Sequence, residues 1–142
     1  MASFEVDGIV ELENDLIAVM DLPDSVADGI LNAEADVIAE AQQRAITKMW
    51  KGRYSTGTTA RAVKKGRVRK KSSGKYITVY PQGSRNRKEK SYRNAEIAFV
   101  NEYGKRGQPG RPAIRIANEQ AADKAAAAGE KVYNDYLDSK NL

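Results

Sequence analysis

Charge is sorted along this chain into an acidic, a basic and a balanced segment. Residues 1–43 contain eleven acidic residues and no Lys or Arg, whereas residues 44–93 contain seventeen basic residues and a single acid, Glu89. Residues 94–142 contain seven of each, so the formal charges of the three segments are −11, +16 and 0. A folded chain whose charge is divided in this way is strongly dipolar. Such a dipole favours head-to-tail association between copies, or contact between the basic part and nucleic acid.

Length and composition indicate one globular domain that lacks the residues most used in catalysis. The chain has 142 residues, 41% hydrophobic and 30% charged, which suffices to bury a core in a single domain spanning residues 1–142. No apolar run approaches the roughly 18 residues that a membrane span needs, and the acidic start is unlike a signal peptide. Cys and His are absent, which excludes disulfides and removes the commonest general base and metal ligand. We therefore expect a non-enzymatic, cytosolic protein without membrane contact, cofactor or metal.

Two helices are predicted in the acidic segment. Apolar residues recur at near-helical spacing and predict a short helix from about Asp7 to Met20. Pro23 interrupts this pattern and suits the first turn of a second, longer helix that reaches about Lys51. Asp21 is the expected capping residue of that helix, and Gly52 is expected to end it.

The basic segment changes from helical to strand periodicity. We expect a turn at residues 54–57 and one or two helical turns over residues 58–64. Alternating β-branched and aromatic residues predict a hairpin between residues 67–69 and residues 76–80. Residues 82–93 are almost without apolar side chains, and they predict a solvated, mobile loop.

The last third is expected to end in a long helix. Residues 95–100 fit a strand or a short helix, residues 103–110 form a turn-rich connector, and Pro112 opens a helix to about Leu137. The predicted fold class is α+β, with long helices packed on one face of a small antiparallel sheet and an extended basic hairpin and loop. Within this domain, residues 1–51 form an acidic helical part. Residues 52–103 form a basic part with hairpin, loop and strand, and residues 104–142 form a connector and the last helix.

Basic residues supply the candidate contact site. They cluster on the predicted hairpin and loop, with Tyr76, Tyr80 and Tyr92 interleaved, a pattern that can hold phosphates and stack bases. The same residues can equally contact an acidic protein surface, including the helices of a neighbouring copy. The acids of residues 5–40 are read as solvent-facing helix residues, not as a carboxylate pair. The candidate contact residues are Arg67, Arg69, Lys70, Lys71, Arg85, Arg87, Lys88, Lys90 and Arg93.

A short motif lies between the basic segment and the last helix. An Ala- and Ile-rich stretch within residues 95–117 runs into Glu102-Tyr103-Gly104, and Arg111-Pro112 follows after a short loop. This pattern resembles the signature of the head–tail joining, or tail completion, proteins of long-tailed double-stranded-DNA phages and prophages. The Tyr54-Ser55-Thr56-Gly57 turn is similar to the Thr-Gly element of that family, whereas Ala113 and Ile114 replace its usual aromatic residue.

The resemblance implies a structural protein of the virion, assembled in the host cytoplasm. It implies a neck component that forms a ring of its own copies between connector and tail. The implied partners are the connector or head completion proteins and the tail tube or tail terminator proteins. The charge sorting suggests that the acidic helices of one subunit contact the basic hairpin and loop of the next. The alternative is a nucleic-acid-binding module that uses residues 61–93, and transient DNA contact is compatible with both.

Elementary chemistry gives the motif a structural role. Glu102 can accept hydrogen bonds from nearby backbone amides or pair with Arg111. Gly104 supplies a turn conformation that a side chain would oppose. Tyr103 is expected to anchor this turn against the core, and Pro112 to open the last helix.

Overall fold

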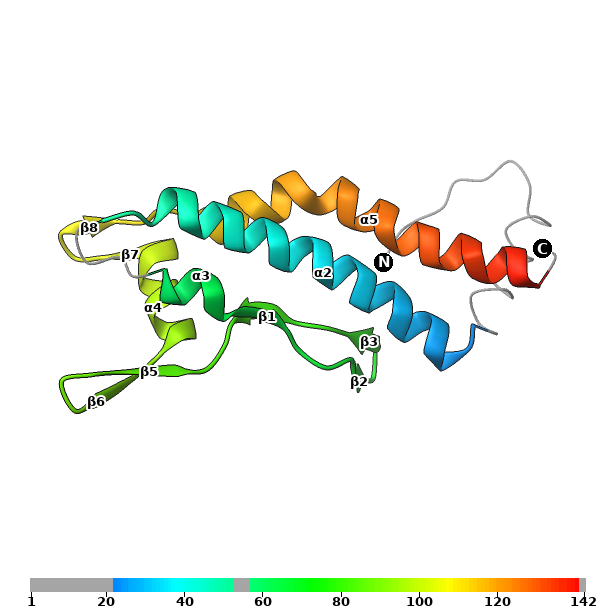
Figure 1. Cartoon of the computed structure of the whole chain (residues 1–142), viewed down its shortest axis with the longest axis horizontal. Helices are drawn as coiled ribbons and strands as arrows, with labels where there is room; N and C mark the ends of the chain where they lie inside the picture. Colours follow the sequence, from blue (N-terminus) through cyan, green and yellow to red (C-terminus); the bar gives the residue numbers. More distant parts are fainter. Residues whose placement is uncertain (1–21, 53–56, 141–142) are drawn as a thin grey trace.

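The computed structural model describes residues 22–52 and 57–140. Its two longest elements are helices that lie side by side and run antiparallel (Figure 1). Helix α2 spans Asp24–Met49, and helix α5 spans Ala113–Ser139 beside it. The buried face of α5 carries only small residues at four-residue spacing, so the two helices can approach closely. These small residues are Ala113, Ala117, Ala121, Ala125 and Gly129.

The predicted bounds of both long helices are confirmed to within about two residues. Pro23 is the residue before α2, and Trp50 is the residue that closes it. Pro112 likewise precedes α5, where its fixed backbone angle suits the entry into a helix. The helix expected over residues 7–20 and the cap expected from Asp21 lie outside the described residues.

The predicted hairpin is present, but its ladder is interrupted. Helix α3 (Thr58–Ala62) leads into β1 (Val63–Lys65), which pairs with β4 (Val79–Pro81). Further out, β2 (Arg69–Lys71) pairs with β3 (Gly74–Tyr76).

A one-residue offset separates the two halves of this hairpin. The Gly66 amide donates to the Thr78 carbonyl at 2.8 Å, and Arg69 pairs with Tyr76. This register leaves Arg67 and Val68 opposite Ile77 alone. An extra residue on one strand bends and twists a hairpin, and here the outer half lies beside the first turns of α2 (Figure 1).

The loop expected over residues 82–93 is wrong, because this segment forms a second hairpin. Strand β5 (Ser84–Arg87) pairs with β6 (Lys90–Arg93). Its two-residue turn consists of Lys88 and Glu89, with φ values of 49° and 65°. Turns of this shape usually carry Asn or Gly, so the sequence offered no recognisable turn signal.

Residues 95–100, for which the sequence allowed a strand or a short helix, belong to helix α4 (Asn94–Tyr103). The strand that we expected in the part 52–103 is therefore wrong at this position. The connector that follows is a tight hairpin of β7 (Gly104–Lys105) and β8 (Gln108–Pro109). Within the described ranges the strands form four separate two-stranded ladders. The α+β class is confirmed, with long helices packed against small antiparallel sheets.

The hydrophobic core gathers where the C-terminal end of α2 meets α3, β1, α4 and the start of α5. Ile46, Trp50 and Val63 are its large members, Pro81 of β4 is also fully buried, and the other buried hydrophobic residues of the described part are alanines. No helix among the described residues is long and apolar enough to cross a membrane.

Candidate functional site

Glu102 caps the last helix from outside it. Its Oε2 accepts a hydrogen bond from the Ile114 amide at 2.9 Å, and its Oε1 accepts one from the Arg115 amide at 2.8 Å. These amides lie in the first turn of α5, where backbone donors have no partner within the helix. A negative carboxylate also suits the positive end of the helix. The expected backbone role of Glu102 is confirmed, whereas no ion pair joins it to Arg111.

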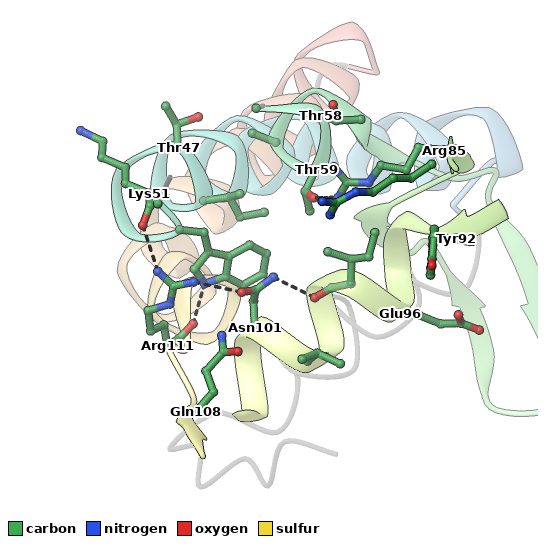
Figure 2. A pocket seen from close by; sticks show the side chains of 18 of the residues that line it. Thr47, Lys51, Thr58, Thr59, Arg85, Tyr92, Glu96, Asn101, Gln108 and Arg111 are labelled. Carbon is green, nitrogen blue, oxygen red and sulfur yellow. Dashed lines mark hydrogen bonds between the residues drawn. The ribbon is translucent and has the colours of Figure 1, made fainter. Parts of the chain in front are cut away.

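Arg111 instead ties together the ends of two other helices. Its Nη1 donates to the carbonyl oxygens of Met49 at 3.2 Å and Lys51 at 3.3 Å, at the end of α2. Its Nη2 donates to Asn101 Oδ1 at 3.0 Å in α4, as Figure 2 shows. The indole nitrogen of Trp50 donates to the Arg111 carbonyl at 2.7 Å. We call Glu102 and Arg111, with these partners, the helix clamp.

Gly104 behaves as the motif predicts, and Tyr103 does not. Gly104 has a φ of 84°, and an added Cβ would lie 2.5 Å from the Gly110 nitrogen and 2.7 Å from the Gln108 carbonyl. Tyr103 is 72% exposed, so the expected anchoring against the core is wrong. Its ring instead contacts that of Phe99, which is 64% exposed and one turn earlier in α4; the ring centroids are 4.8 Å apart and the ring planes are tilted by 49°.

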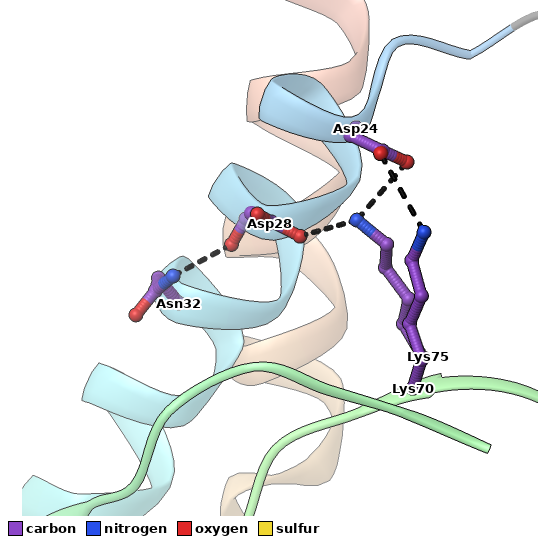
Figure 3. A network of polar contacts seen from close by, with 5 residues as sticks. All are labelled: Asp24, Asp28, Asn32, Lys70 and Lys75. Atoms are coloured by element: carbon purple, nitrogen blue, oxygen red, sulfur yellow. Dashed lines mark hydrogen bonds and ion pairs between the residues drawn. The ribbon is translucent and has the colours of Figure 1, made fainter.

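The acidic helix and the basic hairpin meet within one chain. Lys75 Nζ lies 2.7 Å from Asp28 Oδ1 and 3.1 Å from Asp24 Oδ1, and Lys70 Nζ lies 3.7 Å from Asp24 Oδ2 (Figure 3). A separate pair joins Lys65 to Asp36 at 2.9 Å. Part of the sorted charge is therefore matched inside the molecule.

These contacts shift the proton equilibria of the two groups involved most closely. Hydrogen bonding to Lys75, with the nearby charges of Lys70 and Lys75, holds the pKa of Asp24 below its ordinary value. The hydrogen bond to Asp28 and the neighbouring Asp24 raise the pKa of Lys75, although desolvation opposes this.

The structure divides the predicted contact residues between two distant hairpins. Arg67, Arg69, Lys70 and Lys71 belong to the first hairpin or its bend, near the start of α2. Lys71 Nζ also lies 5.2 Å from the centre of the Tyr76 ring. The others lie on the β5–β6 hairpin near the opposite end of α2 (Figure 1), so the nine residues do not form one surface.

A pocket of about 700 Å³ lies beside the β5–β6 hairpin (Figure 2). Its apolar wall includes Ile46, Trp50, Ile97 and Val100. Five cations also line it, whereas Glu96 is the one carboxylate among its described lining residues. The cations are Lys51, Arg85, Arg87, Lys105 and Arg111.

None of these five cations forms an ion pair with another described residue. Arg85 Nη2 donates to Thr59 Oγ1 at 2.6 Å, while the buried Nε of Arg85 has no partner in the described part. Sequence reasoning missed Lys51, Lys105 and the pocket itself. No local signal could have revealed them, because α2, α3, β5–β6, α4 and β7–β8 each contribute only a few lining residues.

The described residues contain no group of three or more acidic side chains placed to hold a metal ion. Comparisons of the chain with protein-family models, with curated proteins and with solved structures found no match.

Proposed function

We propose that this protein is a structural component of a phage virion, a neck protein that joins head to tail or completes the tail. The observation that carries the proposal is the helix clamp. Glu102 and Arg111, by which the sequence resembles that family, use their polar side-chain atoms to bind backbone groups of α2 and α5 and the Asn101 side chain of α4. This use of the motif supports a protein whose task is to hold a shape.

The surface of the protein supports assembly with other chains. Phe99 and Tyr103 present exposed aromatic rings, and the β5–β6 hairpin presents cations without described ion-pair partners. A head-to-tail contact joins two different surfaces of the same chain and closes into a ring when the rotation permits. Copies of the chain would form this ring between the connector or head completion protein and the tail tube or tail terminator protein. Assembly would take place in the host cytoplasm.

Removal of the gene from its phage or prophage tests this proposal. We expect filled heads and separate tails, or tails with an unfinished head-proximal end, in electron micrographs of the induced culture. Complementation by the wild-type gene should restore joined particles. Intact infectious particles without the protein, or its absence from the neck of purified virions, would contradict the proposal.

Duplex DNA is the second candidate partner, and one observation favours it. Arg87, Lys88, Lys90 and Arg93 are exposed on one hairpin together with Tyr92, and cations beside an aromatic ring suit nucleic acid. This function predicts a gel shift of arbitrary duplex DNA at low salt. Replacement of those four cations by Gln should abolish the shift. Replacement of Lys124, Lys131 and Lys140, which lie along or next to α5, should not.

A further inference from the structure

The ion pairs among the described residues do not include the cations of the pocket, and the sequence that precedes α2 is acidic. Within residues 22–52 and 57–140, Asp24, Asp28 and Asp36 pair with lysines of the first hairpin. The five cations of the pocket have no such partner. Residues 1–21 contain six carboxylates and no Lys or Arg. The sequence before α2 is therefore acidic, and five cations without an ion-pair partner in the described part of the chain line the pocket.

The pocket is suited to a segment that is both acidic and apolar. Its charged rim includes Lys51, Arg87 and Lys105, and its wall is formed by side chains such as Trp50 and Ile97. Residues 1–21 combine their six carboxylates with Phe4, Val6, Ile9, Val10, Leu12 and Leu16. A nucleic-acid backbone would satisfy the cations but would leave the aliphatic part of the wall uncovered. A peptide of this composition satisfies both, because apolar burial supplies affinity and charge complementarity supplies register.

We propose that the pocket binds residues 1–21 of a neighbouring copy of the chain. This proposal rests on the proposed assembly into a ring and names the contact that would build it. The contact is head to tail, because the donated segment and the receiving pocket are different surfaces.

The arrangement of α2 favours a neighbouring copy over the same chain. The segment precedes α2, whereas Ile46, Trp50 and Lys51 place the pocket at the other end of that helix. Helix α2 has 26 residues and is about 39 Å long. To occupy its own pocket, the segment would have to run back along the whole length of this helix. A second copy placed end to end presents its pocket directly to that segment.

Charge reversal in the full-length chain tests the contact. One variant carries Glu11→Lys and Glu13→Lys in the segment, and the other carries Arg87→Glu and Lys105→Glu in the pocket. These positions avoid the helix clamp and the Arg85 hydrogen bond. We expect each variant to assemble at least about tenfold more weakly than the wild type in sedimentation velocity, because like charges then face each other across the contact.

A one-to-one mixture of the two variants decides between a neighbouring copy and the same chain. In the mixture, every wild-type segment can meet a wild-type pocket, and every reversed segment can meet a reversed pocket. Assembly should therefore recover in the mixture if the contact lies between copies. If the segment binds within its own chain, mixing restores nothing and the proposal is overturned.

Two matched controls carry the same changes of charge on exposed positions of α5. They are Asp123→Lys with Glu130→Lys, and Lys124→Glu with Lys131→Glu, and both should assemble like the wild type. Controls that lose assembly as strongly would show an effect of net charge and would overturn the proposal. Loss of duplex DNA binding in the pocket variant, with assembly intact, would assign the pocket to nucleic acid instead.

Trp50 provides a direct readout of the pocket. It is the one tryptophan of the chain and lines the pocket. A synthetic peptide of residues 1–21, added to the full-length variant with the reversed segment, should change Trp50 fluorescence to saturation. The same peptide should leave the pocket variant unchanged. A wild-type chain that assembles while the peptide has no effect overturns the docking but leaves the ring proposal standing, whereas a wild-type chain that never assembles removes both.

Discussion

The Arg111 guanidinium donates a hydrogen bond to the carbonyl of Met49, 62 residues earlier in the chain. That carbonyl belongs to the last turn of α2, where acceptors have no partner within the helix. Arg111 lies just before α5 and also reaches Asn101 in α4. One side chain therefore fixes the point where three helices meet, beside the pocket that we assign to the neighbouring copy.

Replacement of Arg111 should destabilise this junction. We expect Arg111→Met to lower the free energy of unfolding by about 2–3 kcal/mol, because several hydrogen bonds from a charged group are lost together. Arg111→Lys should recover less than half of this loss, since an ammonium lacks the planar fork of donors. Urea denaturation measures both values. Arg106→Met is the control, because Arg106 is exposed and should change stability by less than about 0.5 kcal/mol.

Glu102 should contribute as a helix cap does. Glu102→Ala leaves the amides of Ile114 and Arg115 without their partner and should cost about 1–2 kcal/mol. Glu102→Gln keeps one acceptor oxygen and should cost less. Glu119→Ala removes only an exposed contact of 4.0 Å with Arg115, and thermal unfolding should barely change. Equal losses at positions 102 and 119 would contradict the capping role.

Gly→Ala substitutions at three positions distinguish the cost of a strained φ from the cost of a steric clash. Gly104→Ala combines a positive φ with a collision against the backbone of Gly110, and should cost more than about 3 kcal/mol. Gly107 has a φ of 82°, but an added Cβ would meet no other atom, so Gly107→Ala should lower the free energy of unfolding by only about 1 kcal/mol. Gly52→Ala meets neither obstacle and should be nearly neutral. A Gly104→Ala protein as stable as Gly107→Ala would show that the close approach to β8 is unimportant.

Docking of the first hairpin on α2 should depend on pH at both extremes. The pKa of Asp24 is lowered in the folded state, so its contribution is present above its ordinary pKa and is lost as the pH falls below about 4. The pKa of Lys75 is raised, so its contribution is lost as the pH rises above its ordinary value of about 10. The hydrogen-exchange protection factors of the β2–β3 amides, which are corrected for the intrinsic effect of pH on exchange, should therefore be largest between these limits. Asp24→Asn should remove the loss of protection below about pH 4. If this variant lost protection at acid pH as the wild type does, Asp24 would not be the group responsible.

Glu34 should oppose folding at neutral pH. Its side chain lies over Gly129 between the two long helices, and burial raises the pKa of its carboxyl. A group whose pKa is raised on folding stabilises the fold in its protonated form, and this benefit is lost as the pH rises. Glu34→Gln should therefore raise the melting temperature at pH 7, and the difference should shrink towards pH 4. Glu40→Gln, on the exposed Glu40–Arg44 pair, should show no such trend.

The long helices were predictable because their signals are local. Apolar spacing and the prolines at positions 23 and 112 placed both helices to within about two residues. The backbone role of Glu102 and the turn at Gly104 also followed from residue chemistry. Tyr103 was misplaced because its outward direction depends on how α4 packs, which no local pattern encodes.

Elements that depend on unusual turns or on distant segments were not predictable. The sequence did not predict the β5–β6 hairpin, because Lys88 and Glu89 occupy turn positions that usually carry Asn and Gly. The pairing of Lys75 with Asp28 depends on the offset in the first hairpin, which appears only once the register is known. The pocket likewise requires the tertiary fold, since its cations come from separate elements.

The run of alanines and glycine along α5 has a mechanical consequence. Short side chains cannot change rotamer to let the two helices slide or separate, so this pair behaves as a stiff strut about 40 Å long. Whatever engages one end of the strut is held at a constant distance from the ion-paired hairpin at the other. If copies join end to end, the length of this strut would fix the spacing between successive contacts.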